Sequence, residues 1–194
     1  MPLAAQTSVG TALKVHGTSL NVLDGQAATV TGTLQALVRL GGLPGRIVTL
    51  QALGRGGWST VARTRTGPKG RFRLRYATRQ TGTERVRLRF AGAGTELGAH
   101  RRLGQLNVYR LAEASWYGGG GGLACGGSLT SATMGVANKT LPCGTLVTLR
   151  YGGRSVRVPV VDRGPYVAGR EFDLTQATKQ ALGFGDTGEL WSTR

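Results

Sequence analysis

Glycine is the residue type that most constrains the fold of this chain. It fills 33 of the 194 positions, roughly 17%, against about 7% in an average protein. The glycines follow no collagen period, so they indicate many turns between short strands and exclude a helical bundle. Hydrophobic residues make up 40% and charged residues 18% of the chain, which is typical of a folded protein and not of a disordered one.

Charge divides the chain into two parts. The net charge is +16, and residues 1–112 hold 17 basic and three acidic residues, whereas residues 113–194 hold eight and six. Such asymmetry indicates two modules, one of which meets an anionic partner. We therefore expect a tail over 1–13, a basic domain over 14–112 and a second domain over 113–194.

The basic domain has the pattern of an all-β fold. Runs rich in β-branched and aromatic residues alternate with turn signals such as Gly-Pro-Lys-Gly at 67–70. About seven strands in about 100 residues favour an immunoglobulin-like or transthyretin-like β-sandwich. The expected strands cover 20–23, 28–34, 46–53, 58–63, 71–76, 85–90 and 106–109.

Two of these strands carry most of the charge. Arginines alternate with Phe72, Leu74 and Tyr76 in one run, and with Val86, Leu88 and Phe90 in the other. Because strand side chains alternate with period two, the apolar sets can face a core while the arginines line an outer face. That face is either simply solvated or a binding surface for an anionic polymer. Its six residues are Arg71, Arg73, Arg75, Arg85, Arg87 and Arg89.

Nucleic acid is the usual partner of so basic a chain. The basic runs contain no recognisable nucleic-acid-binding motif, and their aromatic residues lie on the inward parity. Nucleic-acid binding is therefore the third of our functional alternatives.

The two cysteines, Cys125 and Cys143, lie 18 positions apart. They cannot form a zinc site alone, and His16 and His100 belong to the other domain, so we expect no metal. The cysteines are either a disulfide or two buried free thiols. A disulfide would stabilise the fold by about 3 kcal/mol and favours an oxidising compartment.

No stretch approaches the roughly 18 apolar residues of a membrane span, and residues 1–6 are too short for a signal peptide. The chain is thus cytosolic, or exported by a signal outside this sequence. Glycines at 118–122 and a GxGxxG match at 183–188 lack the Lys-Ser/Thr and the βαβ unit of phosphate-binding loops, so no cofactor is expected.

Four motifs in the second domain are informative together: Ala-Ser-Trp-Tyr-Gly at 114–118, Asn-Lys-Thr-Leu-Pro-Cys-Gly-Thr at 138–145, Val-Asp-Arg-Gly-Pro-Tyr at 161–166 and Phe-Asp-Leu-Thr at 172–175. In this order, residues 113–194 closely resemble the double-psi β-barrel domain of the rare lipoprotein A (RlpA) family, relatives of expansins and family 45 endoglucanases. The cysteines resemble those of actinobacterial members, in which the barrel often follows an extra domain. The resemblance implies a six-stranded barrel with one short helix, export, and action on cell-wall glycan.

Some family members are lytic transglycosylases, and Asp162 and Asp173 are the candidate catalytic residues. Inverting hydrolysis needs two carboxyl groups, whereas a lytic transglycosylase needs one acid, because the muramic acid's own 6-hydroxyl is the nucleophile. Each Asp has a structural alternative. Asp162 can begin a turn, and Asp173 can cap a helix, with Gln176 completing a capping box.

Five further residues are candidates for substrate binding. The aromatic ones can stack on sugar rings or pack in the core, and an Asn can hydrogen-bond a sugar but cannot transfer a proton. Active members resembling this chain carry Glu, Asp and His where it has Gly127, Thr130 and Asn138. The five candidates are Trp116, Tyr117, Asn138, Arg163 and Tyr166.

The leading hypothesis is an exported cell-wall protein that acts on peptidoglycan glycan strands as a lytic transglycosylase. The alternative is an expansin-like barrel that binds or loosens the wall without catalysis. In either case the arginine face would contact anionic wall polymers, and those contacts would weaken with salt.

Overall fold

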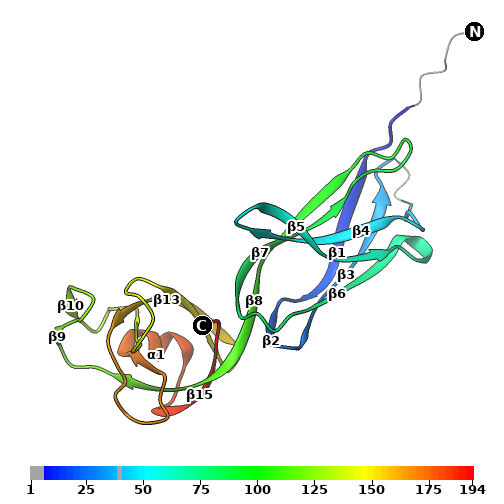
Figure 1. Ribbon diagram of the computed structural model, residues 1–194. Coiled ribbons are helices and arrows are strands. Elements are labelled where there is room, and N and C mark those ends of the chain that lie inside the picture. The colour runs from blue at the N-terminus through cyan, green and yellow to red at the C-terminus, as the bar shows by residue number, and fades with distance from the viewer. Residues whose placement is uncertain (1–6, 39–40) are drawn as a thin grey trace, which may run out of the picture. The chain divides into compact units, whose positions relative to one another are not determined.

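The computed structural model describes residues 7–38 and 41–194, and its chain divides into two compact units, Met1–Val108 and Tyr109–Arg194 (Figure 1). Strands dominate both units, and one short α-helix occurs in the described residues. The all-β prediction is therefore confirmed. No helix in the described part of the chain is long and apolar enough to cross a membrane.

The first unit consists of two β-sheets around one core. One sheet has the order β1-β3-β6, and the other joins β2, β8, β7, β4 and β5. Buried residues from both sheets, among them Leu34, Leu50 and Leu88, form a single cluster, so the unit is a β-sandwich. Its strands are β1 (Thr11–Ser19), β2 (Asn21–Leu23), β3 (Ala27–Ala36), β4 (Ile47–Gly54), β5 (Gly57–Arg65), β6 (Arg71–Ala77), β7 (Gly82–Phe90) and the first half of β8 (Ala99–Tyr117), with a 3-10 turn at Pro68–Gly70.

The unit boundaries differ somewhat from those expected. Strand β1 begins at Thr11, inside the segment 1–13 that the sequence suggested as a tail, and residues 1–6 of that segment lie outside the described residues. The immunoglobulin-like topology and the division at residue 112 stay predictions.

The alternating arginine runs lie on strands, as expected, but not on one face. Phe72 and Leu74 of β6 and Val86 and Leu88 of β7 are buried, so the arginines between them point outward. However, β6 pairs with β3, whereas β7 pairs with β4 and β8. The chain changes sheets between the two runs, so the expectation of six arginines on one face is wrong: each sheet carries three.

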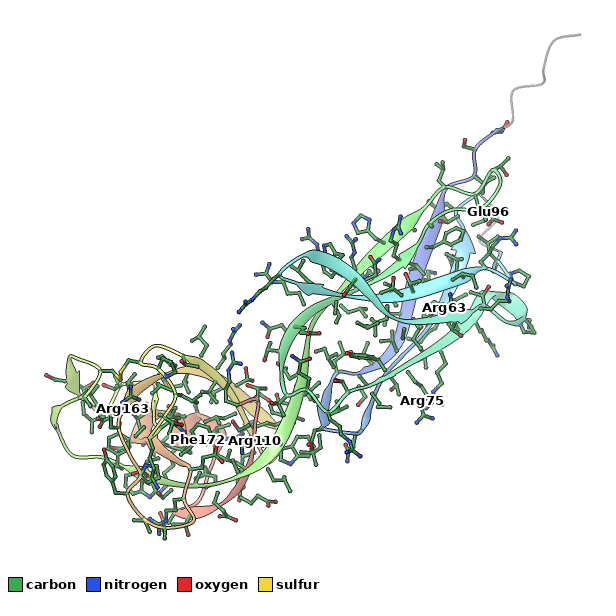
Figure 2. All side chains as sticks on the ribbon, in the orientation of Figure 1. Arg63, Arg75, Glu96, Arg110, Arg163 and Phe172 are labelled. Carbon is green, nitrogen blue, oxygen red and sulfur yellow. A yellow bond between two sulfur atoms is a disulfide. The ribbon has the colours of Figure 1, made fainter. Side chains whose placement is uncertain are left out.

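The second unit is a closed barrel. Within residues 109–194, all of them described, six strands follow the order β14-β11-β13-β12-β15-β8, and a further pairing of β14 with β8 closes the ring. The pairs β11–β13 and β14–β8 are parallel. Fully buried side chains such as Phe172, labelled in Figure 2, fill its core. The elements after β8 are β9 (Gly121–Gly122), β10 (Ser128–Leu129), β11 (Val136–Ala137), β12 (Leu146–Tyr151), β13 (Arg154–Asp162), β14 (Phe172–Thr175), α1 (Gln176–Leu182) and β15 (Thr187–Ser192).

Helix α1 is capped by a residue other than the one expected. Its N-cap is Thr175, whose hydroxyl accepts a hydrogen bond from the backbone N–H of Thr178 at 3.4 Å. Asp173 lies two residues earlier in β14, so its alternative role as a helix cap is wrong. The helix ends at Gly183, which adopts the left-handed conformation with φ 66°.

Cys125 and Cys143 form a disulfide, with their Cα atoms 5.5 Å apart. The backbone N–H of Cys125 donates to the carbonyl of Val161 at 3.2 Å, so the bridge fastens two loops beside the end of β13. The preference for a disulfide over free thiols is confirmed.

Replacing both cysteines with serine should lower the free energy of unfolding of the second unit by about 3 kcal/mol, because the loop-closure constraint on the unfolded chain is lost. The measurement is urea unfolding followed by tryptophan fluorescence, with Trp58→Phe in both proteins so that only Trp116 and Trp191 report. Superimposable unfolding curves would contradict the prediction.

Candidate functional site

A row of four residues crosses neighbouring strands of the barrel. Ala137 of β11 pairs with Asp162 of β13 on one side and with Asp173 of β14 on the other, and Asp173 pairs with Ser115 of β8. Adjacent strands lie about 4.8 Å apart, so the backbones of the two aspartates are separated by about 10 Å. The small side chain of Ala137 lies between them. The barrel thus brings together the two carboxylates that the sequence singled out.

Asp173 is half-buried, and the hydroxyl of Ser115 donates a hydrogen bond to its Oδ1 at 2.8 Å. Burial raises the pKa of this carboxyl above its ordinary value. The Ser115 hydrogen bond and the charge of Arg170 lower the pKa, and the charge of Asp162 raises it further. Asp173 therefore keeps its proton to a higher pH than a free Asp does.

Asp162 organises the backbone around the site. Its Oδ1 accepts hydrogen bonds from the backbone N–H groups of Ala124 at 2.9 Å and Arg163 at 2.8 Å. The expected turn-forming role is thus confirmed, and it extends to the loop that holds Cys125. Because the charge of Asp162 also raises the pKa of Asp173, this carboxylate serves both the loop and the site.

Tyr117 adds a hydroxyl next to the two carboxylates. Burial raises its pKa, and the negative charges of Asp162 and Asp173 raise it further. The hydroxyl oxygen is buried and forms no hydrogen bond of regular geometry within the described part of the chain, although the Asp162 carboxylate is near enough to raise its pKa as an acceptor. A buried hydroxyl without a partner is costly, so Tyr117 is suited to bind an oxygen atom of a substrate.

The other two aromatic candidates have different surroundings. Trp116 donates from Nε1 to Asp186 at 3.0 Å, and the Lys179 ammonium lies 3.9 Å from its ring centroid. Tyr166 is 81% exposed, which excludes core packing and leaves its ring free to stack on a sugar. Whether either ring binds substrate stays a prediction.

Asn138 and Arg163 stabilise a loop, and their expected role in substrate binding stays a prediction. Asn138 is buried, and its side-chain oxygen accepts from the backbone N–H groups of Thr140 at 3.1 Å and Leu141 at 2.8 Å. The guanidinium of Arg163 (Figure 2) donates to the carbonyls of Asn138 at 3.0 Å and Leu141 at 2.7 Å. The Asn138 amide nitrogen also donates to the carbonyl of Glu171 at 3.1 Å. The two side chains thus supply hydrogen-bond partners to backbone groups of residues 138–141 and of the segment before β14.

The positions where active family members have acids carry none here. Gly127 has φ 83°, in the left-handed region, and the hydroxyl of Thr130 accepts from the backbone N–H of Ala132 at 3.3 Å. The titratable groups of the site are consequently Asp162, Asp173 and Tyr117, with Arg170 nearby. Within the described residues, no group of three or more His, Cys, Asp or Glu side chains could hold a metal ion.

Sequence reasoning missed Ser115 and Arg170. Ser115 had a signal: it lies two residues before Tyr117 on a strand, so both point to the same side while Trp116 points to the other. Arg170 had none, since it belongs to the loop before β14, where no periodicity applies.

Comparisons with known proteins agree with this geometry. Residues 111–190 match a protein-family model described as lytic transglycolase. The chain is 45% identical over 75 residues to the probable endolytic peptidoglycan transglycosylase RlpA of Aquifex aeolicus, a match covering 36% of this chain and 33% of that protein. It is 39% identical over 87 residues to the endolytic peptidoglycan transglycosylase RlpA of Pseudomonas aeruginosa, covering 42% and 26%.

A solved structure, the Streptomyces papain inhibitor, is similar at 27% identity and a TM-score of 0.36, over 44% of this chain and 94% of that one. The chain spans about a quarter to a third of the length of the first two relatives. The family match and the closed six-stranded barrel together identify the second unit of this chain as an RlpA-like double-psi β-barrel domain.

Proposed function

We propose that the barrel cleaves peptidoglycan glycan strands as a lytic transglycosylase, with Asp173 as its single acid and base. The observation that carries this proposal is the raised pKa of the Asp173 carboxyl, caused first by burial, beside an Asp and a Tyr on neighbouring strands. The names of the relatives support the substrate class. A site on peptidoglycan places the protein outside the cell or in the wall.

The reaction needs two proton transfers, one from Asp173 and one to it. Protonated Asp173 donates its proton to the glycosidic oxygen as the bond from muramic acid C1 to that oxygen breaks. The 6-hydroxyl of the same muramic acid then bonds to C1 and gives its proton to the Asp173 carboxylate. The product carries a 1,6-anhydro ring, and Asp173 regains its starting state without consuming water.

The neighbouring residues have supporting roles in this mechanism. Ser115 orients the Asp173 carboxyl through its hydrogen bond, and the charge of Asp162 adds to the rise in pKa that burial causes. The buried Tyr117 hydroxyl donates to a substrate oxygen. One acid suffices here, so the replacements at Gly127, Thr130 and Asn138 do not remove the chemistry.

A second candidate is a barrel that binds glycan without turnover, as in expansins. The observation in its favour is that Gly127, Thr130 and Asn138 all have structural surroundings and supply no acid. Product analysis separates the two functions.

Asp173→Asn should abolish anhydromuramic ends, lowering their yield at least 100-fold, because an amide cannot donate the proton. The assay is mass spectrometry of soluble products from glycan strands with and without stem peptides. Glu189→Gln, which changes an exposed carboxylate on β15, should retain activity within threefold. Retention of the wild type on insoluble wall with no soluble product would instead establish the binding function, and reducing ends would establish hydrolysis.

The pH profile of kcat/KM should shift in opposite directions in two variants. The acid is active when protonated, so the rate falls as pH rises through the pKa of Asp173. Ser115→Ala removes a hydrogen bond that lowers this pKa, so the alkaline limb should move to higher pH. Asp162→Asn removes a charge that raises it, so the limb should move to lower pH. Shifts in the same direction would contradict Asp173 as the acid.

The raised pKa of Asp173 should also affect how the stability of the protein depends on pH, which can be measured without an activity assay. Above the ordinary pKa of an Asp, the unfolded chain releases a proton that folded Asp173 retains, so this group destabilises the fold as pH rises. Asp173→Asn should therefore raise the thermal midpoint at pH 7 and leave it unchanged at pH 3. Calorimetry at both pH values tests this, and a lower midpoint at pH 7 would refute it.

A further inference from the structure

The outer face of one sandwich sheet gathers basic side chains from three strands. In the register of β7 with β8, Arg87 is opposite Arg102 and Arg89 is opposite His100. In the register of β4 with its two neighbours, Thr49 lies between Arg89 and Arg63. We define the basic face as Arg63, Arg85, Arg87, Arg89, His100 and Arg102.

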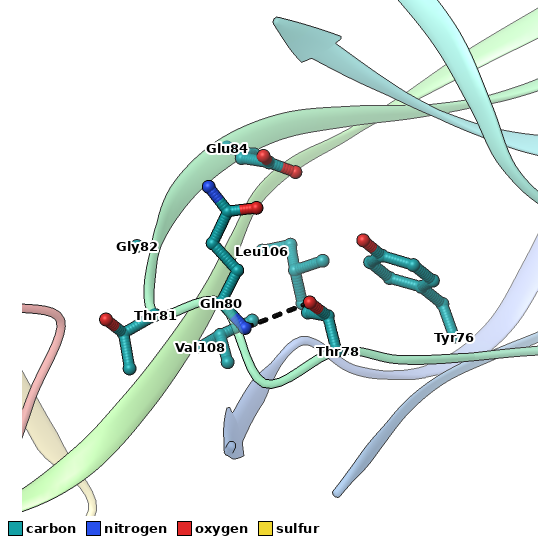
Figure 3. Close-up of a pocket in the computed structure, with 8 residues that line it drawn as sticks. All are labelled: Tyr76, Thr78, Gln80, Thr81, Gly82, Glu84, Leu106 and Val108. Carbon is teal, nitrogen blue, oxygen red and sulfur yellow. Dashed lines mark hydrogen bonds between the residues drawn. The ribbon is translucent and has the colours of Figure 1, made fainter. Parts of the chain in front are cut away.

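The acidic residues of the first unit lie away from the basic face. Glu96 forms a two-pronged ion pair with Arg46, at 2.6 and 2.8 Å, and Asp24 lies in the turn after β2. Glu84 lines a small cavity of about 30 Å³ (Figure 3), room for roughly one water molecule. Like charges about 5 to 7 Å apart repel, and no acid of the described residues 7–38 and 41–108 offsets this repulsion on the face.

Contacts with neighbouring side chains hold Arg87 in place on the basic face. The Arg87 guanidinium stacks 4.2 Å from the ring centroid of Trp58, and its Nε donates to Oε1 of the buried Gln51 at 2.9 Å. Beside this stack is a hollow of about 410 Å³ lined by apolar, aromatic and basic side chains. Gly104 lines the hollow at an irregularity in the β7–β8 register. Because it has no side chain, the space beside its backbone stays open. The side chains that line the hollow include Leu53, Trp58, Arg85 and Arg102.

The other sheet provides a comparison within the same molecule. Arg71, Arg73 and Arg75 of β6 are equally exposed, but their cross-strand neighbours are Thr33, Thr31 and Thr29. Strand β6 thus carries three outward arginines, as β7 does, but no tryptophan lies among their cross-strand neighbours in β3. Both faces therefore carry exposed arginines, whereas the hollow and Trp58 belong to the basic face.

We propose that the basic face binds a linear anionic polysaccharide. The guanidinium groups pair with its phosphate or carboxylate groups, whose planar or forked geometry suits arginine. Trp58 and Leu53 provide the apolar surface on which a sugar ring packs. Nucleic acid fits less well, because single strands are held by a series of aromatic rings that stack on successive bases. Trp58 is the one Trp, Tyr or Phe among the described outward residues of β4, β5, β7 and the part of β8 in the first unit, residues 99–108.

Two triple variants test the proposal at equal net charge. Arg85→Gln/Arg89→Gln/Arg102→Gln alters the basic face, and Arg71→Gln/Arg73→Gln/Arg75→Gln alters the other sheet. All six side chains are exposed, and each variant lowers the net charge from +16 to +13. The probes are polygalacturonate, poly(glycerol phosphate), neutral dextran and single-stranded oligo(dT), at about 0.1 M salt, where charges are screened beyond ~10 Å. None contains muramic acid, so the result does not depend on the barrel's activity.

The wild type should bind polygalacturonate and should not bind dextran. Binding of poly(glycerol phosphate) without polygalacturonate, or of neither polymer, would overturn the proposal, since poly(glycerol phosphate) has no sugar ring. The basic-face variant should bind at least tenfold more weakly, and the β6 variant less than threefold more weakly. Equal losses in the two variants would overturn the proposal, since net charge alone would then explain binding. Tighter binding of oligo(dT) than of either anionic polymer would overturn it as well.

Trp58→Leu tests the sugar contact separately. It should weaken polygalacturonate binding at least fivefold and change binding of inorganic polyphosphate less than twofold. If both probes are affected equally, the hollow does not bind a sugar ring and the polysaccharide assignment is wrong. Circular dichroism of each variant confirms that the sandwich remains folded.

Discussion

The parallel pairing of β14 with β8 is the constraint on which the barrel and its site both depend. It joins the last strand before α1 to the long strand that enters the second unit, and so closes the ring. The same register turns Phe172 and Leu174 into the core and Asp173 to the other side, where Ser115 meets it. Because a strand alternates its side chains, burying the two apolar residues fixes the direction of the carboxyl between them. Core packing thus positions the proposed acid.

The loops around the site hold that acid in surroundings which oppose its ionisation. The disulfide, the Asp162 carboxylate and the Arg163 guanidinium each fasten backbone near Asp173. Partial burial of a carboxyl costs stability when it ionises, and these contacts offset that cost. In this arrangement Asn138 and Arg163, which the sequence suggested for substrate binding, hydrogen-bond to backbone groups of the loop that follows β11. The pKa of Asp173 is raised mainly by burial. That burial depends on loops whose backbone is itself held by hydrogen bonds and the disulfide.

The sequence predicted most of the architecture and part of the site. Period-two patterns located the strands of the sandwich, and the four motifs identified the barrel and both aspartates. Two kinds of information were missing. Alternation tells which side chains point inward but not which sheet a strand joins, so the arginines of β6 and β7 were placed on one face. Helix-cap patterns tolerate a shift of two residues, so Asp173 and Thr175 could not be distinguished until the β14 pairing was known.

Because the arginines are divided between two sheets, their charge leads to a different conclusion about the kind of partner they bind. Six arginines on one continuous surface would suggest general attraction to any polyanion, which falls off steeply with salt. The basic face sets five arginines beside a tryptophan and a hollow, an arrangement that can recognise both the charge and the sugar of a polymer. If both proposals hold, a polymer bound by the basic face is presented to the barrel at a raised effective concentration, because the two units share one chain. The charge of the first unit would then act on the proposed reaction by supplying substrate, without contributing a group to the site itself.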